Sequence, residues 1–218
     1  NDMLPTYVLL LEHGAENIPP GQQKVGNTKP SEVKETDPCW SEADFDSSQS
    51  LRTLLDRSAI PYKVSPSTNV NDLSVIQLLK KRPEDVFVFS GFGGVLLRSD
   101  ILACGKKFLH IHGGYLPDYK GSTTNYYSLI EESKMGASAM FLNETIDGGP
   151  VLLRRKFSPP ADLKEVDHIY DSAARAKVLV DVLAQYEKSK KWEFELPNNS
   201  GGETFYVIHP VLKHIAIL

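Results

Sequence analysis

The densest group of reactive side chains in the sequence is His110-Ile111-His112, which Gly113 and Gly114 follow directly. Residues two apart in a β-strand point to the same face of the sheet, so the two imidazoles are predicted to project together. The two glycines would let a ligand approach the backbone, opening space beside it or exposing N–H groups to it. Imidazole donates hydrogen bonds and carries protons near neutral pH, which is the chemistry of acid–base catalysis.

A second polar motif, Thr145-Ile146-Asp147-Gly148-Gly149-Pro150, stands between two apolar runs. An Asp-Gly pair alone usually marks only a turn. A carboxylate beside a histidine, however, orients the ring and favours its charged form. His110, His112 and Asp147 are therefore interpreted as one catalytic cluster. The alternative is a mononuclear metalloenzyme, in which two histidines and one carboxylate bind a divalent metal.

Alternating strands and helices are predicted to position both motifs. Apolar runs indicate strands at residues 7–11, 62–64, 86–89, 108–111, 137–142 and 151–157, and the apolar stretch from 205 onward is interpreted as a strand that docks back. Helices are indicated at 47–58, after Asp72, after Thr123 or Thr124, and over 162–186, where Asp162 and Glu165 have capping-box spacing. The two histidines therefore end a strand, and Asp147 lies in a loop.

The alternation over residues 4–135 predicts an α/β fold, with a Rossmann-like, mostly parallel sheet and helices on both faces. Ligands bind at the carboxyl ends of the strands in such sheets. Prolines and glycines interrupt the pattern over residues 15–50, which predicts a long irregular segment. We expect a catalytic domain over residues 1–195 and a C-terminal extension over 196–218 that packs on the domain or forms a homodimer contact.

Composition narrows the function classes. The net charge of −4 over 218 residues lacks the basic excess of nucleic-acid-binding proteins. No run approaches the roughly 20 apolar residues of a membrane helix, so no membrane partner is expected. The two cysteines, Cys39 and Cys104, favour reduced thiols and a cytoplasmic location. Without a Cys-x-x-Cys pair, a thiolate zinc site is not expected.

Three motifs in order carry a family resemblance. The segment from Val86 to Phe157 resembles the folate-dependent formyltransferases, which typically show Asn-Ile-His-Pro-Ser before a Leu-Pro step, a Gly before a helix, and a Leu-Asp-x-Gly-Pro step. Residues 110–117, Gly121 and residues 146–150 are similar to these, and residues 90–96 resemble the run leading into the folate pocket. The sequence departs from the family where the usual Asn is His110 and Pro-Ser is Gly113-Gly114.

The resemblance implies transfer of a formyl group from N10-formyltetrahydrofolate to a primary amine, without a metal. His112, with His110, would stabilise the oxyanion, and Asp147 would pair with His112 and relay the amine's proton through water. The implied folate-binding residues are Phe92, Gly93, Gly94, Val95, Leu96, Met140, Phe141, Leu142 and Asn143, although the apolar ones could be core. The acceptor could contact Gly113, Gly114, Tyr115, Tyr119, Lys120 and Asn125.

The acceptor amine is predicted from the groups of formyltransferases that the chain resembles. The chain resembles small sugar-nucleotide N-formyltransferases and peptide-synthetase formylation domains. We therefore expect the amino group of a UDP- or dTDP-linked amino deoxy sugar, as used in surface-glycan biosynthesis. Aminoacyl groups and glycinamide ribonucleotide are alternatives by the same chemistry, and the acidic composition disfavours tRNA. A non-catalytic folate-binding module and a hydrolase of the formyl-folate are rival classes.

Overall fold

The computed structural model describes residues 3–12, 50–91 and 93–218, and its centre is a four-stranded sheet. The strands lie in the order β3 (Val86–Val88), β4 (Lys107–His112), β6 (Met135–Phe141) and β7 (Val151–Phe157). β3 and β4 are parallel, whereas β4–β6 and β6–β7 are antiparallel. The predicted α/β Rossmann-like fold is confirmed, but this sheet is mixed rather than mostly parallel. The connection over residues 142–150 is shorter than the dozen or so residues that a parallel crossover needs.

Two smaller sheets flank the central one. β1 (Val8–Leu10) pairs in parallel with β2 (Tyr62–Val64). β5 (Tyr119–Gly121) pairs in parallel with β8 (Glu203–Phe205), which joins two segments about 80 positions apart in the chain. The second pair lies beyond the carboxyl end of β4, where the sequence places its reactive residues.

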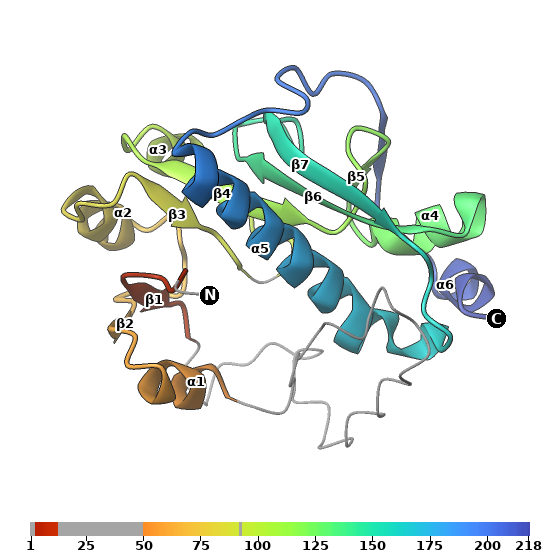
Figure 1. Ribbon diagram of the computed structural model, residues 1–218, viewed down its shortest axis with the longest axis horizontal. Coiled ribbons are helices and arrows are strands. Elements are labelled where there is room, and N and C mark those ends of the chain that lie inside the picture. Colours follow the sequence, from red (N-terminus) through yellow and green to blue (C-terminus); the bar gives the residue numbers. More distant parts are fainter. Residues whose placement is uncertain (1–2, 13–49, 92) are drawn as a thin grey trace.

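Helices cover both faces of the sheet. α5 (Asp171–Ser189) runs diagonally across β4, β6 and β7 (Figure 1), and its Val178 packs with Leu109 and Ile111 of β4. On the opposite face, Phe108 packs with α2 (Leu73–Lys80) and α3 (Ser99–Leu102). Successive β4 residues point to opposite faces, so burial on both sides explains the strand's continuous apolar run.

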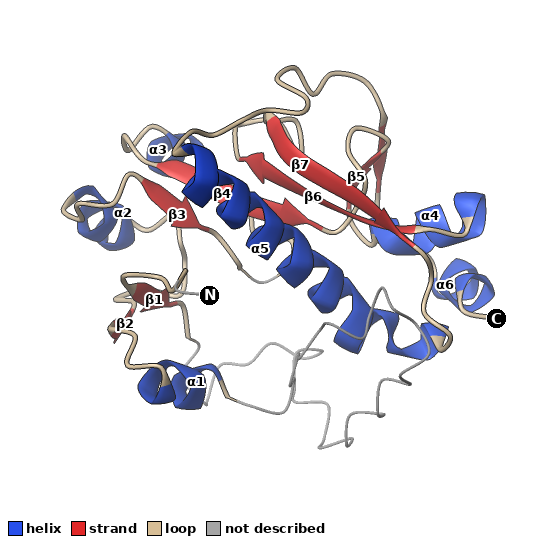
Figure 2. Cartoon of the chain, in the orientation of Figure 1, coloured by secondary structure: helices blue, strands red, loops and turns tan. Residues whose placement is uncertain are grey.

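Three helices lie at the edges. α1 is Leu51–Arg57, α4 is Thr124–Glu132 and α6 is Pro210–Ala216. Figure 2 shows α4 and α6 side by side at one end of the sheet, where their residues are in contact. The described residues include no helix that is long and apolar enough to cross a membrane.

Helix boundaries follow the capping predictions in part. The Asp72 carboxylate accepts a hydrogen bond from Ser74 N at 2.8 Å and begins α2, as predicted. Thr123 precedes α4 but has a positive φ of 52° and makes no capping bond with its side chain. The long helix expected over 162–186 begins as a 3₁₀ turn (Leu163–Glu165) and a π-helical turn (Val166–Tyr170) before α5 starts.

The C-terminal segment differs from its prediction. The strand expected from 205 onward is β8, which ends at Phe205, and the following apolar residues form α6 instead. Pro210 occupies the first turn of α6, where its missing N–H leaves no hydrogen bond unmade. Leu196 forms an isolated antiparallel bridge with Val151 of β7, so the C-terminal segment contacts the central sheet there. The predicted irregular segment 15–50 lies outside the described residues except for Ser50.

Candidate active site

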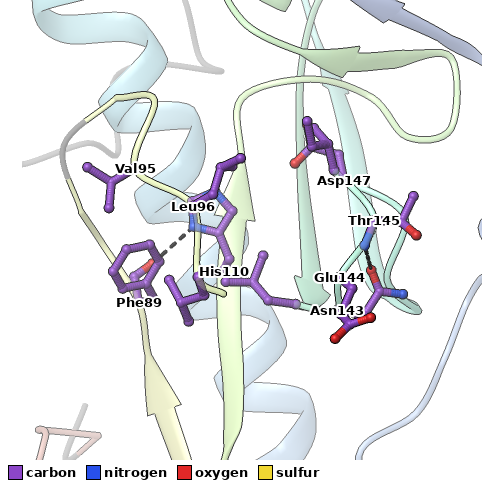
Figure 3. Close-up of a pocket in the computed structure, with 11 residues that line it drawn as sticks. Phe89, Val95, Leu96, His110, Asn143, Glu144, Thr145 and Asp147 are labelled. Atoms are coloured by element: carbon purple, nitrogen blue, oxygen red, sulfur yellow. Dashed lines mark hydrogen bonds between the residues drawn. The ribbon is translucent and has the colours of Figure 1, made fainter. Parts of the chain in front are cut away.

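A cleft opens at the carboxyl end of β4, between the loop that follows β3 and the loop that follows β6. Figure 3 shows His110 between Val95 and Leu96 on one side and Asn143 and Asp147 on the other. The cleft holds about 520 Å³ of space, including the part open to solvent. Its described lining residues are Phe89, Val95, Leu96, Leu97, His110, Leu142, Asn143, Glu144, Thr145, Ile146 and Asp147. This is the position at which α/β sheets bind ligands.

His110 presents a fixed tautomer to the cleft. Its Nδ1 lies 3.0 Å from the Phe89 carbonyl oxygen, which only accepts, so Nδ1 carries the hydrogen (Figure 3). In the neutral ring, Nε2 then holds a lone pair, and no described residue bonds to it. Burial is the main cause that lowers the pKa of His110 from its usual value near 6.5.

Nearby charges act on the same ring. The charges of His112 and Arg175 lower the pKa of His110 further, whereas its bond to Phe89 and the Asp147 carboxylate oppose the shift. Burial remains the largest effect, so His110 is neutral at pH 7. The sequence predicted an oxyanion donor here, but the neutral ring with a bonded Nδ1 is a proton acceptor.

His112 lies behind the cleft rather than on its wall. Its side chain is 6% exposed, and Nε2 is 2.7 Å from the Tyr119 carbonyl oxygen. Nδ1 faces Asp147 Oδ2 at 3.5 Å, which confirms that the structure brings this predicted pair together. Both ring nitrogens therefore face protein oxygens, and His112 contacts the cleft through Asp147.

Asp147 connects His112 to the cleft. Its Oδ2 accepts a hydrogen bond from Gly121 N at 2.7 Å, and no described residue donates to Oδ1. The residue has a positive φ of 47°, a conformation that aspartate tolerates better than most residues. The carboxylate is thus held from behind by one oxygen while the other is available to a ligand.

The predicted folate residues divide into cleft and core. Val95, Leu96, Leu142 and Asn143 line the cleft, and Gly94 lines an adjoining hollow together with Arg98 and Ser99. Gly93 lines neither, and Phe92 lies outside the described residues.

The side chains of Met140 and Phe141 lie in the core, which corrects their predicted place in the folate site. Met140 is fully buried against Leu116 and Val151, and Phe141 packs in the main core. Every residue of β6 is buried, so the strand offers these side chains no path to the cleft.

Gly113 and Gly114 do not open space for a ligand, contrary to the prediction. A Cβ at Gly113 would lie 2.5 Å from Asp171 Oδ1, and one at Gly114 would lie 2.6 Å from His112 Nε2. Both residues are buried, so these two glycines allow close packing of the catalytic strand against its neighbours.

The other predicted acceptor residues are occupied by protein contacts. Tyr119 donates to Glu131 Oε2 at 2.9 Å, and Asn125 bonds to Asp171 Oδ1 and Gly136 N at 2.7 Å each. Arg154 and Lys156 lie over the Tyr115 ring. The structure therefore shows these three residues packed within the protein.

Lys120 is buried, and its Nζ donates to the Asn199 carbonyl oxygen at 3.0 Å.

Sequence reasoning missed two cleft residues, Phe89 and Leu97, and named Thr145 and Ile146 only as part of the Asp147 motif. The signal that could have found them is position, since each stands within a few residues of a strand end or motif already singled out. No group of three or more histidine, cysteine or acidic side chains arranged to hold a metal occurs in the described part of the chain.

The chain is similar in sequence to a known protein family. A sequence profile of the formyl transferase family matches residues 43–183, which is more than half of the chain, so the chain belongs to that family. The methionyl-tRNA formyltransferase of Listeria welshimeri is 23% identical over 133 residues, covering 60% of this chain and 40% of that protein. The corresponding enzyme of Finegoldia magna is 33% identical over 85 residues, covering 38% of this chain and 27% of that protein. The chain thus spans about 40% or less of the length of these relatives.

Solved structures show the same fold. A sugar N-formyltransferase from a Shewanella species has a TM-score of 0.54 at 17% identity, covering 77% of this chain and 80% of that one. HypX from Aquifex aeolicus in complex with tetrahydrofolic acid has a TM-score of 0.55 at 18% identity, covering 77% of this chain and 29% of that one. The formyltransferase fold is therefore present, with the cleft at the carboxyl ends of its parallel strands.

Proposed function

We propose that this chain transfers a formyl group from N10-formyltetrahydrofolate to a primary amine at the cleft between the two loops. The observation that carries the proposal is that two groups line one cleft: His110, whose Nε2 bonds to no described residue, and Asp147, whose Oδ1 accepts from none. Transfer to an amine must remove protons from the attacking nitrogen, and these groups can accept them.

The lining of the cleft suits a folate in its chemistry. Val95, Leu96 and Leu142 give it apolar walls, and its lining also includes the polar residues Asn143, Glu144 and Thr145. Flat heterocycles are held by such apolar slots with a few polar contacts. When bound, the formyl-folate supplies a carbonyl carbon for attack and a nitrogen that leaves once it is protonated.

The acceptor nitrogen loses two protons during the reaction, and the protein provides one acceptor for each. An ammonium acceptor loses one proton to His110 Nε2, which frees the amine's lone pair for attack on the formyl carbon. His110, now protonated, donates from Nε2 to the developing oxyanion and then gives its proton to the departing folate nitrogen. Asp147 Oδ1 receives the second proton of the new formamide nitrogen and releases it to solvent. The products are the formamide, tetrahydrofolate and one proton.

His112 is a positioning residue in this scheme. Its Nε2 bond to Tyr119 fixes the ring, and its Nδ1 faces the Asp147 oxygen that points away from the cleft. It therefore lies against the carboxylate and acts on the substrate through Asp147. This differs from the direct oxyanion contact that the sequence resemblance implied.

We propose a nucleotide-linked amino sugar as the acceptor. One support is the net charge of −4, which is unfavourable for binding tRNA. The other is the fold shared with the Shewanella sugar N-formyltransferase, since this chain covers 80% of that protein's chain. The methionyl-tRNA formyltransferases make an aminoacyl acceptor the competing candidate. The cytoplasm, where folates and nucleotide sugars are made and used, is the location proposed with it.

The experiment is an acceptor panel. The purified protein is incubated with N10-formyltetrahydrofolate and UDP- or dTDP-linked 3-amino and 4-amino sugars, glycinamide ribonucleotide, aminoacyl carriers or methionyl-tRNA, and tetrahydrofolate release is followed. Release that requires one nucleotide amino sugar supports the whole proposal. Release with another amine keeps the chemistry and overturns the acceptor. Release without any amine indicates a hydrolase, and the absence of release in every case contradicts the proposed reaction.

A further inference from the structure

Asn199 is a buried polar residue in the C-terminal segment that sequence reasoning did not single out. It is 5% exposed, and its Nδ2 donates to two carbonyl oxygens, Asp147 O at 2.6 Å and Gly149 O at 3.1 Å. Both carbonyls belong to the turn that carries the proton-accepting carboxylate. One side chain therefore closes this turn from a point about 50 positions away in the chain.

The turn needs such a partner because Asp147 has a left-handed backbone conformation. Its φ of 47° is unfavourable for a residue with a side chain and persists only where the surroundings hold it. Within the turn, Gly148 N donates to Thr145 O at 3.1 Å, whereas the carbonyls of Asp147 and Gly149 accept from outside the turn. Asn199 supplies both bonds with one amide group.

Asn199 also joins the turn to the strand behind it. Its backbone oxygen accepts from Nζ of Lys120, which is buried and has no acidic partner within ion-pair distance among the described residues. Lys120 lies on β5 between Tyr119, whose carbonyl accepts from His112, and Gly121, whose N–H donates to Asp147. The same segment thus braces the carboxylate and the strand that orients it.

Close backbone contacts fix where the C-terminal segment around Asn199 packs. A Cβ at Gly202 would lie 1.6 Å from Pro117 O, and one at Gly121 would lie 2.0 Å from Phe205 O. Gly202 also has a positive φ of 74°, which favours glycine. Only glycine at both places lets β5 and β8 approach as they do, so Asn199 reaches Asp147 in one defined register.

We propose that Asn199 is a positioning residue for formyl transfer, which fixes the Asp147 turn so that its free carboxylate oxygen faces the cleft. This inference rests on the proposed function for its catalytic consequence. Misplacement of a reacting group by about 1 Å can cost on the order of a hundredfold in rate. We therefore expect Asn199→Ala to lower kcat by about 10- to 100-fold while KM for the formyl donor stays within about threefold.

The test compares Asn199→Ala with Asn198→Ala, a matched exposed neighbour, in wild-type and Asp147→Asn backgrounds. If Asn199 acts through Asp147, its substitution adds no further loss in the Asp147→Asn background. A loss that multiplies in that background, an equal loss in Asn198→Ala, or an unchanged kcat in folded Asn199→Ala overturns the inference.

Hydrogen–deuterium exchange of a peptide covering residues 143–151 gives a readout independent of activity. We expect faster exchange in Asn199→Ala than in Asn198→Ala, with other core peptides unchanged. Unchanged exchange overturns the inference even if the protein transfers formyl groups. If wild-type protein transfers none, the proposed function fails, and faster exchange still supports Asn199 as the residue that holds the Asp147 turn.

Discussion

Replacement of His110 by asparagine separates two roles for this side chain. An amide can donate a hydrogen bond to a formyl oxygen, but it cannot accept a proton near neutral pH. The His110 ring donates from Nδ1 to Phe89 O at 3.0 Å, which leaves only the Nε2 lone pair for a ligand. His110→Asn therefore removes the base while keeping a polar group that can donate a hydrogen bond.

The expected loss follows from that geometry. General base assistance contributes about 10²- to 10⁴-fold, so kcat/KM of His110→Asn should fall by at least about a hundredfold at pH 7.5. Burial lowers the pKa of His110 below about 6.5, so the wild-type rate should fall on the acid side of that pH as the ring becomes protonated. In His110→Asn this acid limb should disappear.

The assay follows tetrahydrofolate release between pH 5.5 and 9 at subsaturating donor, because kcat/KM reports the free enzyme's groups. His214→Asn, which changes an exposed histidine on α6 in the same way, is the control. It should keep the wild-type rate and profile. If His110→Asn retains its rate within about threefold and the acid limb is unchanged, His110 is a hydrogen-bond donor and the reasoning from its tautomer is wrong.

Three further outcomes are expected. Gly114→Ala would place a Cβ 2.6 Å from His112 Nε2, so overpacking should lower the free energy of unfolding by about 1–3 kcal/mol in urea titrations. Met140→Ala, in the core, should lose about 2–5 kcal/mol in the same assay while the Kd for tetrahydrofolate, measured by calorimetry, changes less than threefold. A larger change in Kd would restore Met140 to the folate site. Because the folded pKa of His110 is lowered, the unfolded chain binds its proton more readily, so stability from this group falls as pH drops below about 6.5. His110→Asn should flatten that part of the urea-midpoint curve, and an unchanged slope would exclude a buried neutral ring.

Sequence periodicity was sufficient to predict β4, the strand that carries His110 and His112. The alternation at His110 and His112 reports directly on strand geometry, and the apolar run before them reports on burial by α5 and α2 on opposite faces. The pairing of His112 with Asp147 was also predicted, but from the order and spacing of the motifs rather than from strand direction, since β6 runs antiparallel to β4.

Side-chain packing in the folded chain determines which of the predicted site residues lie in the cleft and which lie in the core. β6 is buried on both faces, so its pattern does not distinguish a pocket residue from a core residue, and Met140 was assigned to the wrong class. Gly113 and Gly114 were interpreted as room for a ligand, but the space belongs to Asp171 on α5 and to His112. Local sequence patterns do not reveal contacts between residues that are far apart in the chain.

Strand direction is a second example. Apolar runs indicate that strands exist but not which way they run, so the mixed pairing of β4, β6 and β7 was missed. For β6 and β7, the length of the 142–150 connection carried that information, since it is too short for a crossover.

The central claim is formyl transfer from folate to an amine at this cleft, and isotopic tracing tests it most directly. The protein is incubated with N10-[¹³C]formyltetrahydrofolate and the acceptor panel, and labelled product and tetrahydrofolate are quantified by mass spectrometry. We predict one ¹³C-formyl group on the acceptor nitrogen for each tetrahydrofolate released, with the yield lost in the His110→Asn, Asp147→Asn double variant. Labelled formate without labelled acceptor, or no tetrahydrofolate at all, would contradict the account.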